Sequence, residues 1–254
     1  MSINGDADDR PLRSGATVAD TGSGLHCVIG ILAALYQRQL TGRGQRIEIV
    51  MQEVVTNMCR ISYAAQIMTG KAAHRKGNQS LISSTSPSEA YPCKGGGPND
   101  YCFIYSSRAT NRHWERLLQV MGREDLIGDP RYTDPFTRFE YHEDIDAMIS
   151  AWTRQHDKRE VMRLLGEAGV AAGAVFDTDD LSHDPNLHER GTMVSVQHPK
   201  RGEFTMPGWP VKMTDSSVPV ECAPPLGRDT GEVLARILGR SAGQIAALRE
   251  EKAI

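Results

Sequence analysis

The pattern of hydrophobic positions changes along the chain and predicts a mixture of helices and strands. Leu25–Leu40 is apolar on nearly every side, with its first polar side chains at the far end. Thr41 and Gly42 follow, and a glycine directly after an apolar run is typical of a helix C-cap. Because a helix without a polar face is normally buried, we expect this one in the interior.

The next two segments predict a strand and a second helix. Arg46–Met51 is rich in β-branched and other apolar residues, which favours a strand. Glu53–Thr69 carries apolar residues at helical spacing. The order helix, strand, helix is typical of an α/β unit on a parallel sheet. One strand makes no sheet, so its neighbours must come from elsewhere in the chain or from outside it.

Lys71–Ser88 is polar and rich in serine, which indicates a linker or a long loop. Asp179–Arg190 is expected to be a polar connector. The other expected elements are a hairpin of Glu89–Pro92 and Tyr101–Tyr105, helices at Asn111–Met121, Arg138–Arg154, Lys158–Glu167, Thr230–Leu238 and Ala242–Glu250, and strands at Ala171–Phe176, Thr192–Val196 and Glu203–Met206.

Composition and charge narrow the class of protein. The chain has 254 residues, 39% of them hydrophobic, which fits one or two globular domains. Its formal net charge of −3 without a basic tract argues against a nucleic-acid partner. Five scattered cysteines without a C-x-x-C pair indicate reduced thiols and no zinc site.

The polar, acidic start of the chain does not resemble a signal peptide. The longest apolar run, Leu25–Tyr36, is interrupted by His26 and Gly30 and is shorter than a membrane span requires. We therefore expect a cytoplasmic protein without a membrane partner.

Asp20 is the first candidate for chemistry, because it directly precedes Thr-Gly-Ser-Gly and the apolar helix. An aspartate there can simply be the N-cap of the helix. The same position can hold an ionised carboxylate as a nucleophile, stabilised by the positive helix end. Gly22 and Gly24 remove side chains near this end, so a ligand could approach the backbone.

Other polar groups favour structural interpretations. His26 lies among buried residue types and is expected to be a satisfied core histidine. Gly95–Gly97 lacks the helix that follows a phosphate-binding loop, and is expected to be a turn. His183-Asp184 and His188-Glu189 lack the helical spacing of metal ligands. Lys71, His74, Arg75 and Lys76 form a small basic patch, expected to be a solvated loop or, as an alternative, a seat for an anion.

Asp20–Arg38, Thr41-Gly-Arg-Gly-Gln45 and Glu48–Glu53 together resemble the signature of family III CoA-transferases. This family includes formyl-CoA:oxalate and carnitine CoA-transferases and, more distantly, α-methylacyl-CoA racemases. The resemblance continues in Tyr91-Pro-Cys93, in His183–Gly191 and in Ala223–Leu234.

The resemblance implies that Asp20 is the catalytic nucleophile. In the implied mechanism the carboxylate attacks an acyl-CoA thioester and forms an acyl-aspartyl anhydride. The CoA thiolate then forms an aspartyl-CoA thioester, from which an acceptor acid takes the CoA. CoA and acyl-CoA are thus expected as substrates, with no bound cofactor and no metal.

The resemblance also implies a fold and an assembly. Family members have a large, Rossmann-like α/β domain and a smaller α+β domain, and two chains interlock as a dimer. Residues 1–68 are expected in the large domain, 69–86 in a linker, 87–177 in the small domain, and 178–254 in a linker and a segment that returns to the large domain.

Three departures from the family pattern modify these expectations. The family's N-terminal segment, with most of its CoA contacts, is expected to be absent, which suggests a partner chain, a truncated chain or a degenerate paralogue. Gly77–Ser86 has one glycine where formyl-CoA transferases have a glycine-rich loop, which leaves oxalate specificity open; Gly77, Asn78 and Gln79 are still expected to bind substrate. Tyr105 is followed by Ser-Ser-Arg108 rather than by the glutamate of the racemases.

Three functions stay open on this basis. A CoA-transferase, or the half of one that carries the aspartate, is favoured. A non-catalytic assembly subunit is the alternative from another class, and an acyl-CoA racemase or isomerase is the alternative within the superfamily. An incomplete sheet would expose an apolar edge, so we expect a homodimer or a partner chain.

Overall fold

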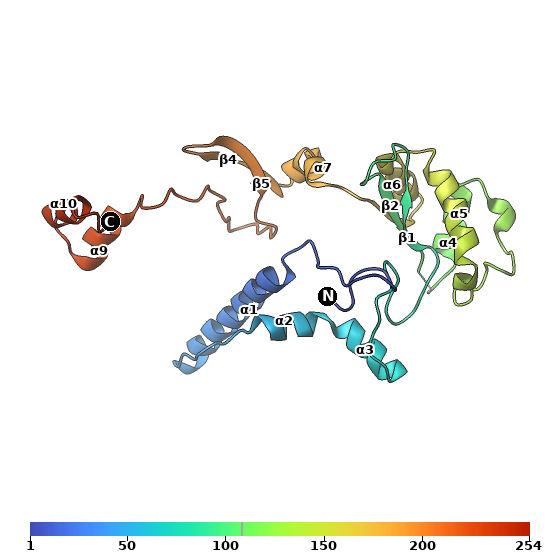
Figure 1. Cartoon of the computed structure of the whole chain (residues 1–254), viewed down its shortest axis with the longest axis horizontal. Coiled ribbons are helices and arrows are strands. Elements are labelled where there is room, and N and C mark those ends of the chain that lie inside the picture. Colours follow the sequence, from blue (N-terminus) through green and yellow to red (C-terminus); the bar gives the residue numbers. More distant parts are fainter. Residues whose placement is uncertain (108) are drawn as a thin grey trace. The chain divides into compact units, whose positions relative to one another are not determined.

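A computed structural model describes residues 1–107 and 109–254. The chain forms two compact units, Met1–Val175 and Phe176–Ile254, and each is described by itself. Figure 1 shows the elements in chain order. The chain is a mixture of helices and strands, as the hydrophobic pattern predicts.

Helix α1, Val18–Thr41, confirms the predicted long helix and begins seven residues earlier than the apolar run. It ends at Gly42, which has a φ of 71° and donates its N–H to the carbonyl of Arg38 at 2.8 Å. The expectation that this helix is buried is wrong. Within it only Gly22 is buried, while Ile29 is 64% and Leu32 60% exposed. The reason is that only α2 and the segment before it, which brings Ile47 against Gly30, lie along α1, and the side that carries Ile29 and Leu32 stays exposed.

Helices α2, Met51–Met58, and α3, Arg60–Thr69, replace the single helix predicted for this region, because the backbone turns at Cys59. The strand predicted at Arg46–Met51 is wrong. Val50 has the extended backbone of a strand, but no described residue pairs with this segment. A strand exists only as part of a hydrogen-bonded ladder, so β-branched composition alone does not produce one.

The hairpin and strand predicted after the linker form a three-stranded antiparallel sheet. Its strands are β1, Ser88–Pro92, β2, Tyr101–Tyr105, and β3, Ala171–Ala174, with β2 in the middle. Tyr91 lies opposite Cys102 and Phe103 opposite Gly173. The parallel sheet of a large α/β domain is not formed within the described residues, whose two sheets are both antiparallel.

Helices α4, Arg112–Val120, α5, His142–Thr153, and α6, Lys158–Glu167, confirm the predicted helices. The short 3-10 turns η1, Glu124–Leu126, and η2, Arg138–Tyr141, lie between α4 and α5. One hydrophobic core joins these helices to the sheet, and its fully buried members include Tyr91, Ile104, Trp114, Leu117, Leu118, Ile145, Ile149 and Leu165.

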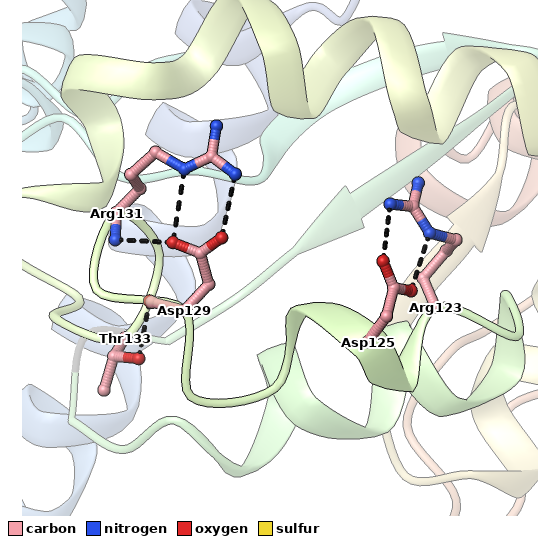
Figure 2. Close-up of polar contacts among 5 residues, drawn as sticks. All are labelled: Arg123, Asp125, Asp129, Arg131 and Thr133. Carbon is pink, nitrogen blue, oxygen red and sulfur yellow. Dashed lines mark hydrogen bonds and ion pairs between the residues drawn. The ribbon is translucent and has the colours of Figure 1, made fainter.

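Two arginine–aspartate pairs fix the connection between α4 and α5 (Figure 2). Arg123 donates two hydrogen bonds to Asp125, at 2.9 and 3.0 Å, and Arg131 donates two to Asp129, at 3.2 and 2.8 Å. These contacts lower the pKa of both aspartates below the ordinary range, chiefly through the hydrogen bonds from the arginines. Both guanidinium groups are therefore engaged within the loop.

The second unit contains helices α7, Thr178–Ser182, and α8, Pro185–Glu189, the hairpin β4, Met193–His198, and β5, Gly202–Pro207, and helices α9, Thr230–Leu238, and α10, Ala242–Glu250. The hairpin and the last two helices agree with the sequence patterns. The polar connector instead forms two short helices, because Asp177 and Asp184 cap them with their side chains. Pro185 at the first position of α8 adds a second start signal.

Candidate functional site

Asp20 lies inside the first turn of α1, where Val18 is the first helical residue and Thr17 the N-cap. The interpretation of Asp20 as the N-cap is therefore wrong. Its side chain is exposed, and no described residue forms a hydrogen bond or ion pair with the carboxylate. An acidic group in the first turn interacts favourably with the positive end of the helix. The helix fixes the backbone position of Asp20, and its carboxylate is open to a reactant.

Gly22 and Gly24 differ in what they contact. A Cβ atom on Gly22 would lie 2.6 Å from Cε of Met58 and 3.3 Å from Val54, so this glycine allows α1 and α2 to pack closely. A Cβ on Gly24 would meet nothing within 4 Å. Both residues lie within the helix, so their amides are not at its open end. The structure gives Gly22 a packing role that the sequence pattern did not suggest.

His26 is hydrogen-bonded as expected, but the expectation that it lies in a core is wrong, because the neighbouring residues of α1 are exposed. It is half-buried, and its Nδ1 lies 2.8 Å from the carbonyl oxygen of Gly22 one turn earlier. This hydrogen bond satisfies one ring nitrogen within α1. The ring is on the same helix as Asp20 but is not among the residues that line the cavity beside it.

A cavity of about 530 Å³ opens beside Asp20. Its walls come from the first turn of α1, from the end of α2 and from the segment before α1, and they are Met1, Ile3, Asn4, Arg13, Ser14, Ala16, Thr17, Val18, Ala19, Asp20, Val55, Met58 and Cys59. This volume is in the range of small-molecule sites. The charged side chains in the lining are those of Arg13 and Asp20, so the cavity joins a carboxylate, a cation and an apolar wall.

Arg75 holds the segment that covers this cavity. Its guanidinium donates to the carbonyl oxygens of Ser2 at 3.4 Å, Asp6 at 3.3 Å and Asp9 at 2.5 Å. The side chain is thus used for protein contacts, against the expectation of a solvated loop or an anion site at this residue. Sequence reasoning missed this role because the contact joins residues more than 60 positions apart, and no local signal marks it.

Gly77, Asn78 and Gln79 do not line the cavity beside Asp20. Gly77 has a φ of 55°, and its N–H donates to the carbonyl of Gly5 at 3.1 Å. The Asn78 amide donates to Glu89, and that of Gln79 donates to the carbonyl of Ser88 at 2.9 Å. The structure therefore brings these residues to the start of β1, and their side-chain contacts are with the protein itself.

The remaining candidates have structural roles. Gly95–Gly97 is a turn, in which the Asp100 carboxylate accepts the N–H of Gly97 at 2.8 Å. His188 lies with Nε2 at 2.7 Å from the carbonyl of Ser182. Within residues 1–107 and 109–254, no group of three or more histidine, cysteine or acidic residues is placed to hold a metal. Arg108, of the stretch after Tyr105, lies outside the described residues.

Among the described helices, α1 is long and apolar enough to cross a membrane, judged by length and composition. It has 24 residues, so the argument from the shorter run Leu25–Tyr36 does not hold. The core helix of a water-soluble protein passes the same test. Length and composition therefore do not decide between these two environments.

The sequence of the chain is similar to that of known proteins. The model of "CoA-transferase family III" matches residues 1–230. Formyl-CoA:oxalate CoA-transferases from Rhodopseudomonas palustris strain BisA53 and from Streptomyces avermitilis are each 34% identical to the whole chain, which spans 63% and 64% of their lengths.

Solved structures show the same fold. A CAIB/BAIF family protein from Brucella suis matches 93% of the chain with a TM-score of 0.76 and 23% identity, over 60% of its own length. The protein Rv3272 from Mycobacterium tuberculosis matches 84% with a TM-score of 0.64 and 22% identity, over 54% of its length.

Proposed function

The chain belongs to CoA-transferase family III, and from this premise we propose that it transfers CoA from an acyl-CoA donor to a carboxylic acid, with Asp20 as the nucleophile. The observation that carries the proposal is the placement of Asp20: an exposed carboxylate in the first turn of a helix, beside a cavity of about 530 Å³. The curated relatives are named for formyl-CoA and oxalate, which makes an acyl-CoA and a carboxylic acid the substrate classes to test.

In the proposed reaction, a carboxylate oxygen of Asp20 attacks the thioester carbon and displaces the CoA thiolate, giving an acyl-aspartyl anhydride. The thiolate attacks the aspartyl carbonyl, releases the first acid and leaves an aspartyl-CoA thioester. The acceptor carboxylate attacks the carbonyl carbon of this thioester, breaks the C–S bond, releases the CoA thiolate and forms a second anhydride. The thiolate then attacks the acceptor's carbonyl, and the new acyl-CoA leaves with Asp20 regenerated.

The position of Asp20 supports the first step. Asp20 lies in the first turn of α1, where a carboxylate interacts favourably with the positive end of the helix. No described side chain competes for it through a hydrogen bond or ion pair. Arg13 lines the same cavity and supplies a cation that can interact with the charge of an attacking or leaving carboxylate.

The test is intact-mass spectrometry of the purified chain after incubation with a panel of acyl-CoAs, followed by peptide mapping. An acyl or CoA adduct on the peptide that contains Asp20 is expected. Asp20→Asn should lose the adduct, and Asp8→Asn, which changes an exposed aspartate of the N-terminal segment, should keep it. A folded chain that forms no adduct with any donor would favour the non-catalytic assembly subunit.

We also propose that full turnover requires a second chain, either another copy or a different partner, because the apolar side of α1 is exposed in the single chain. Steady-state assays at increasing protein concentration, with and without such a chain, separate these cases. An adduct on Asp20 without turnover would show a working nucleophile in an incomplete site.

A further inference from the structure

The cavity of about 530 Å³ beside Asp20 has a balanced pair of charged side chains. Arg13 and Asp20 lie seven positions apart in the chain, and both are exposed. The lining, all of it within the described residues, contains no further charged side chain. The carboxylate and the guanidinium carry opposite charges, so the side-chain charge of the cavity sums to zero while Asp20 is free.

The guanidinium of Arg13 is free to bind a ligand. Within the described part of the chain it donates no hydrogen bond to the protein, and it forms no ion pair with Asp20 or with another carboxylate. Arg75 differs, because backbone carbonyls accept its hydrogen bonds, and Arg123 and Arg131 are paired with aspartates. A guanidinium presents paired N–H donors that match the two oxygens of a carboxylate.

The backbone around Arg13 is anchored on both sides. Directly before it, the N–H of Leu12 donates to the carbonyl of Asn4 at 3.0 Å. After it, α1 begins at Val18 and carries Asp20 in its first turn. The guanidinium and the carboxylate therefore line the cavity from one segment with fixed ends.

The proposed reaction changes the charge of this cavity. A free carboxylate at Asp20 repels a second carboxylate, whereas an anhydride or a thioester at Asp20 is neutral. Once Asp20 is acylated, the guanidinium of Arg13 is the charged side chain that remains in the lining. Removing one charge at a distance of about 4–7 Å in an exposed site changes the affinity for an anion by about threefold to tenfold.

We propose that Arg13 binds the carboxylate of the acceptor acid, and that Asp20 controls this binding: the acid binds more tightly while Asp20 is an anhydride or a thioester. This inference rests on the proposed function, because acylation is what removes the charge of Asp20. Arg13 is then a specificity-determining residue. It favours a carboxylate over water, since a neutral nucleophile gains little from the cation.

The acceptor step follows from this arrangement. One oxygen of the acid stays at the guanidinium of Arg13, and the other attacks the carbonyl carbon of the aspartyl-CoA thioester. The C–S bond breaks, the CoA thiolate leaves, and a neutral anhydride forms at Asp20. Binding at Arg13 brings the acid to this carbon, so the step no longer depends on an encounter from free solution.

The first test compares the full chain with Asp20→Asn, a neutral variant at an exposed position, and uses acetate as the probe. Phenylglyoxal modifies exposed arginines, and peptide mapping follows each one separately. At constant ionic strength, acetate should slow modification of Arg13, at a half-protecting concentration about threefold to tenfold lower in Asp20→Asn than in the parent chain. Arg10, exposed and outside the cavity lining, is the internal control and should show no protection.

Two results would overturn the proposal: equal half-protecting concentrations in the two chains, or no protection of Arg13 in Asp20→Asn. Acetamide has the shape of acetate without its charge and should protect Arg13 in neither chain. Protection by acetamide equal to that by acetate would contradict recognition of a carboxylate.

Met1 also lines the cavity, so its α-amino group is the rival cation. Acetylation of this amine by an N-terminal acetyltransferase removes its charge and leaves Arg13 as it is. Protection of Arg13 by acetate should be unchanged in the acetylated chain. A loss of protection on acetylation would move the carboxylate site to Met1 and overturn the assignment to Arg13.

A chase of the CoA adduct on Asp20 tests the role of Arg13 in transfer. In Arg13→Met the adduct should still form. Its discharge by whichever of formate, acetate and oxalate is fastest in the parent chain should slow at least about tenfold, whereas discharge by neutral hydroxylamine should be unchanged. Arg10→Met is the matched control and should behave like the parent. Equal slowing with both nucleophiles would indicate a structural role and overturn the proposal.

The outcomes separate this proposal from the proposed function. Protection of Arg13 by acetate in Asp20→Asn, with no adduct on Asp20 in the parent chain, would support the carboxylate site and contradict the transferase mechanism. An adduct on Asp20, with Arg13 unprotected by acetate in both chains, would support the transferase and overturn the carboxylate site.

Discussion

At the scale of single residues, the contact between Tyr91 of β1 and Asp146 of α5 depends on whether the carboxyl group of Asp146 is protonated. Tyr91 is 1% exposed, and its hydroxyl donates to Oδ1 of Asp146 at 2.5 Å. Burial raises the pKa of Asp146 above its ordinary range, and the hydrogen bond from Tyr91 acts in the opposite direction. The native state therefore binds a proton at Asp146 more tightly than the unfolded state, and the stability that this provides at low pH is lost as pH rises through the raised pKa.

Tyr91→Phe removes the donor and leaves a half-buried carboxylate without it. We expect the free energy of unfolding to fall by about 1.5–3 kcal/mol at pH 7, and by less at pH 4 and below, where Asp146 is increasingly protonated. Urea denaturation at the two pH values measures the difference. Tyr105→Phe, at a side chain 40% exposed, is the control and should have little effect. An equal loss at both pH values would contradict the role of the charge.

Arg75 is a second residue with a testable role, because it holds the N-terminal segment, which is more than 60 positions away in the chain. Replacing it with methionine removes three hydrogen bonds to the N-terminal segment, at a cost of about 1–3 kcal/mol for its docking. We expect trypsin to cleave after Arg13 several times faster in Arg75→Met than in the parent chain, as followed by mass spectrometry. Lys76→Met, at the exposed neighbouring residue, is the matched control. Equal rates would show that the segment is held by other contacts.

At the scale of elements, the close approach of α1 and α2 depends on Gly22. Alanine is favoured over glycine in a helix by about 1 kcal/mol, so Gly24→Ala, with open space around it, should raise stability by up to that amount. Gly22→Ala must displace the Met58 side chain and should be about 1–2 kcal/mol less stable than Gly24→Ala. Thermal unfolding of the two variants decides this, and equal stabilities would show that Met58 moves at no cost.

The elements also show what sequence patterns can and cannot predict. Helices α4, α5 and α6 are amphipathic, and they pack on a core formed by residues close to them in the chain, so their patterns predict both their limits and their burial. The exposure of α1 and the missing strand at Arg46–Met51 depend on partners that no local pattern specifies. The sequence pointed to Asp20, but not to its cavity, because one wall of the cavity is the N-terminal segment, which Arg75 holds through contacts between residues far apart in the chain.

At the scale of the whole molecule, the exposed apolar side of α1 predicts association. Leu25, Val28, Ile29, Leu32 and Tyr36 are all more than half exposed on this one helix. A contiguous apolar patch of this kind on a soluble protein marks a surface that binds another protein or a membrane. We propose that a second chain covers this face, in line with the proposed need for a second chain in turnover.

The double variant Ile29→Lys, Leu32→Glu should shift the chain toward monomer at a given concentration, as measured by analytical ultracentrifugation. Phe136→Ser, at an apolar side chain 66% exposed in another part of the chain, should not. Flotation with neutral phospholipid vesicles tests the membrane alternative. A protein partner is contradicted if the parent chain stays monomeric in buffer and floats with the vesicles, and the double variant on α1 does not float.

The central position of β2 has a consequence for amide hydrogen exchange. Its backbone is bonded to β1 on one side and to β3 on the other, and β3 comes from a segment about 70 residues later, after α4, α5 and α6. The amides of β2 can therefore exchange only when this whole sheet-and-helix unit opens, whereas those of α1 exchange through local opening of an exposed helix. The slowest deuterium uptake is expected in Tyr101–Tyr105, so α1, which carries Asp20, can open and close while the three-stranded sheet and its helices stay folded.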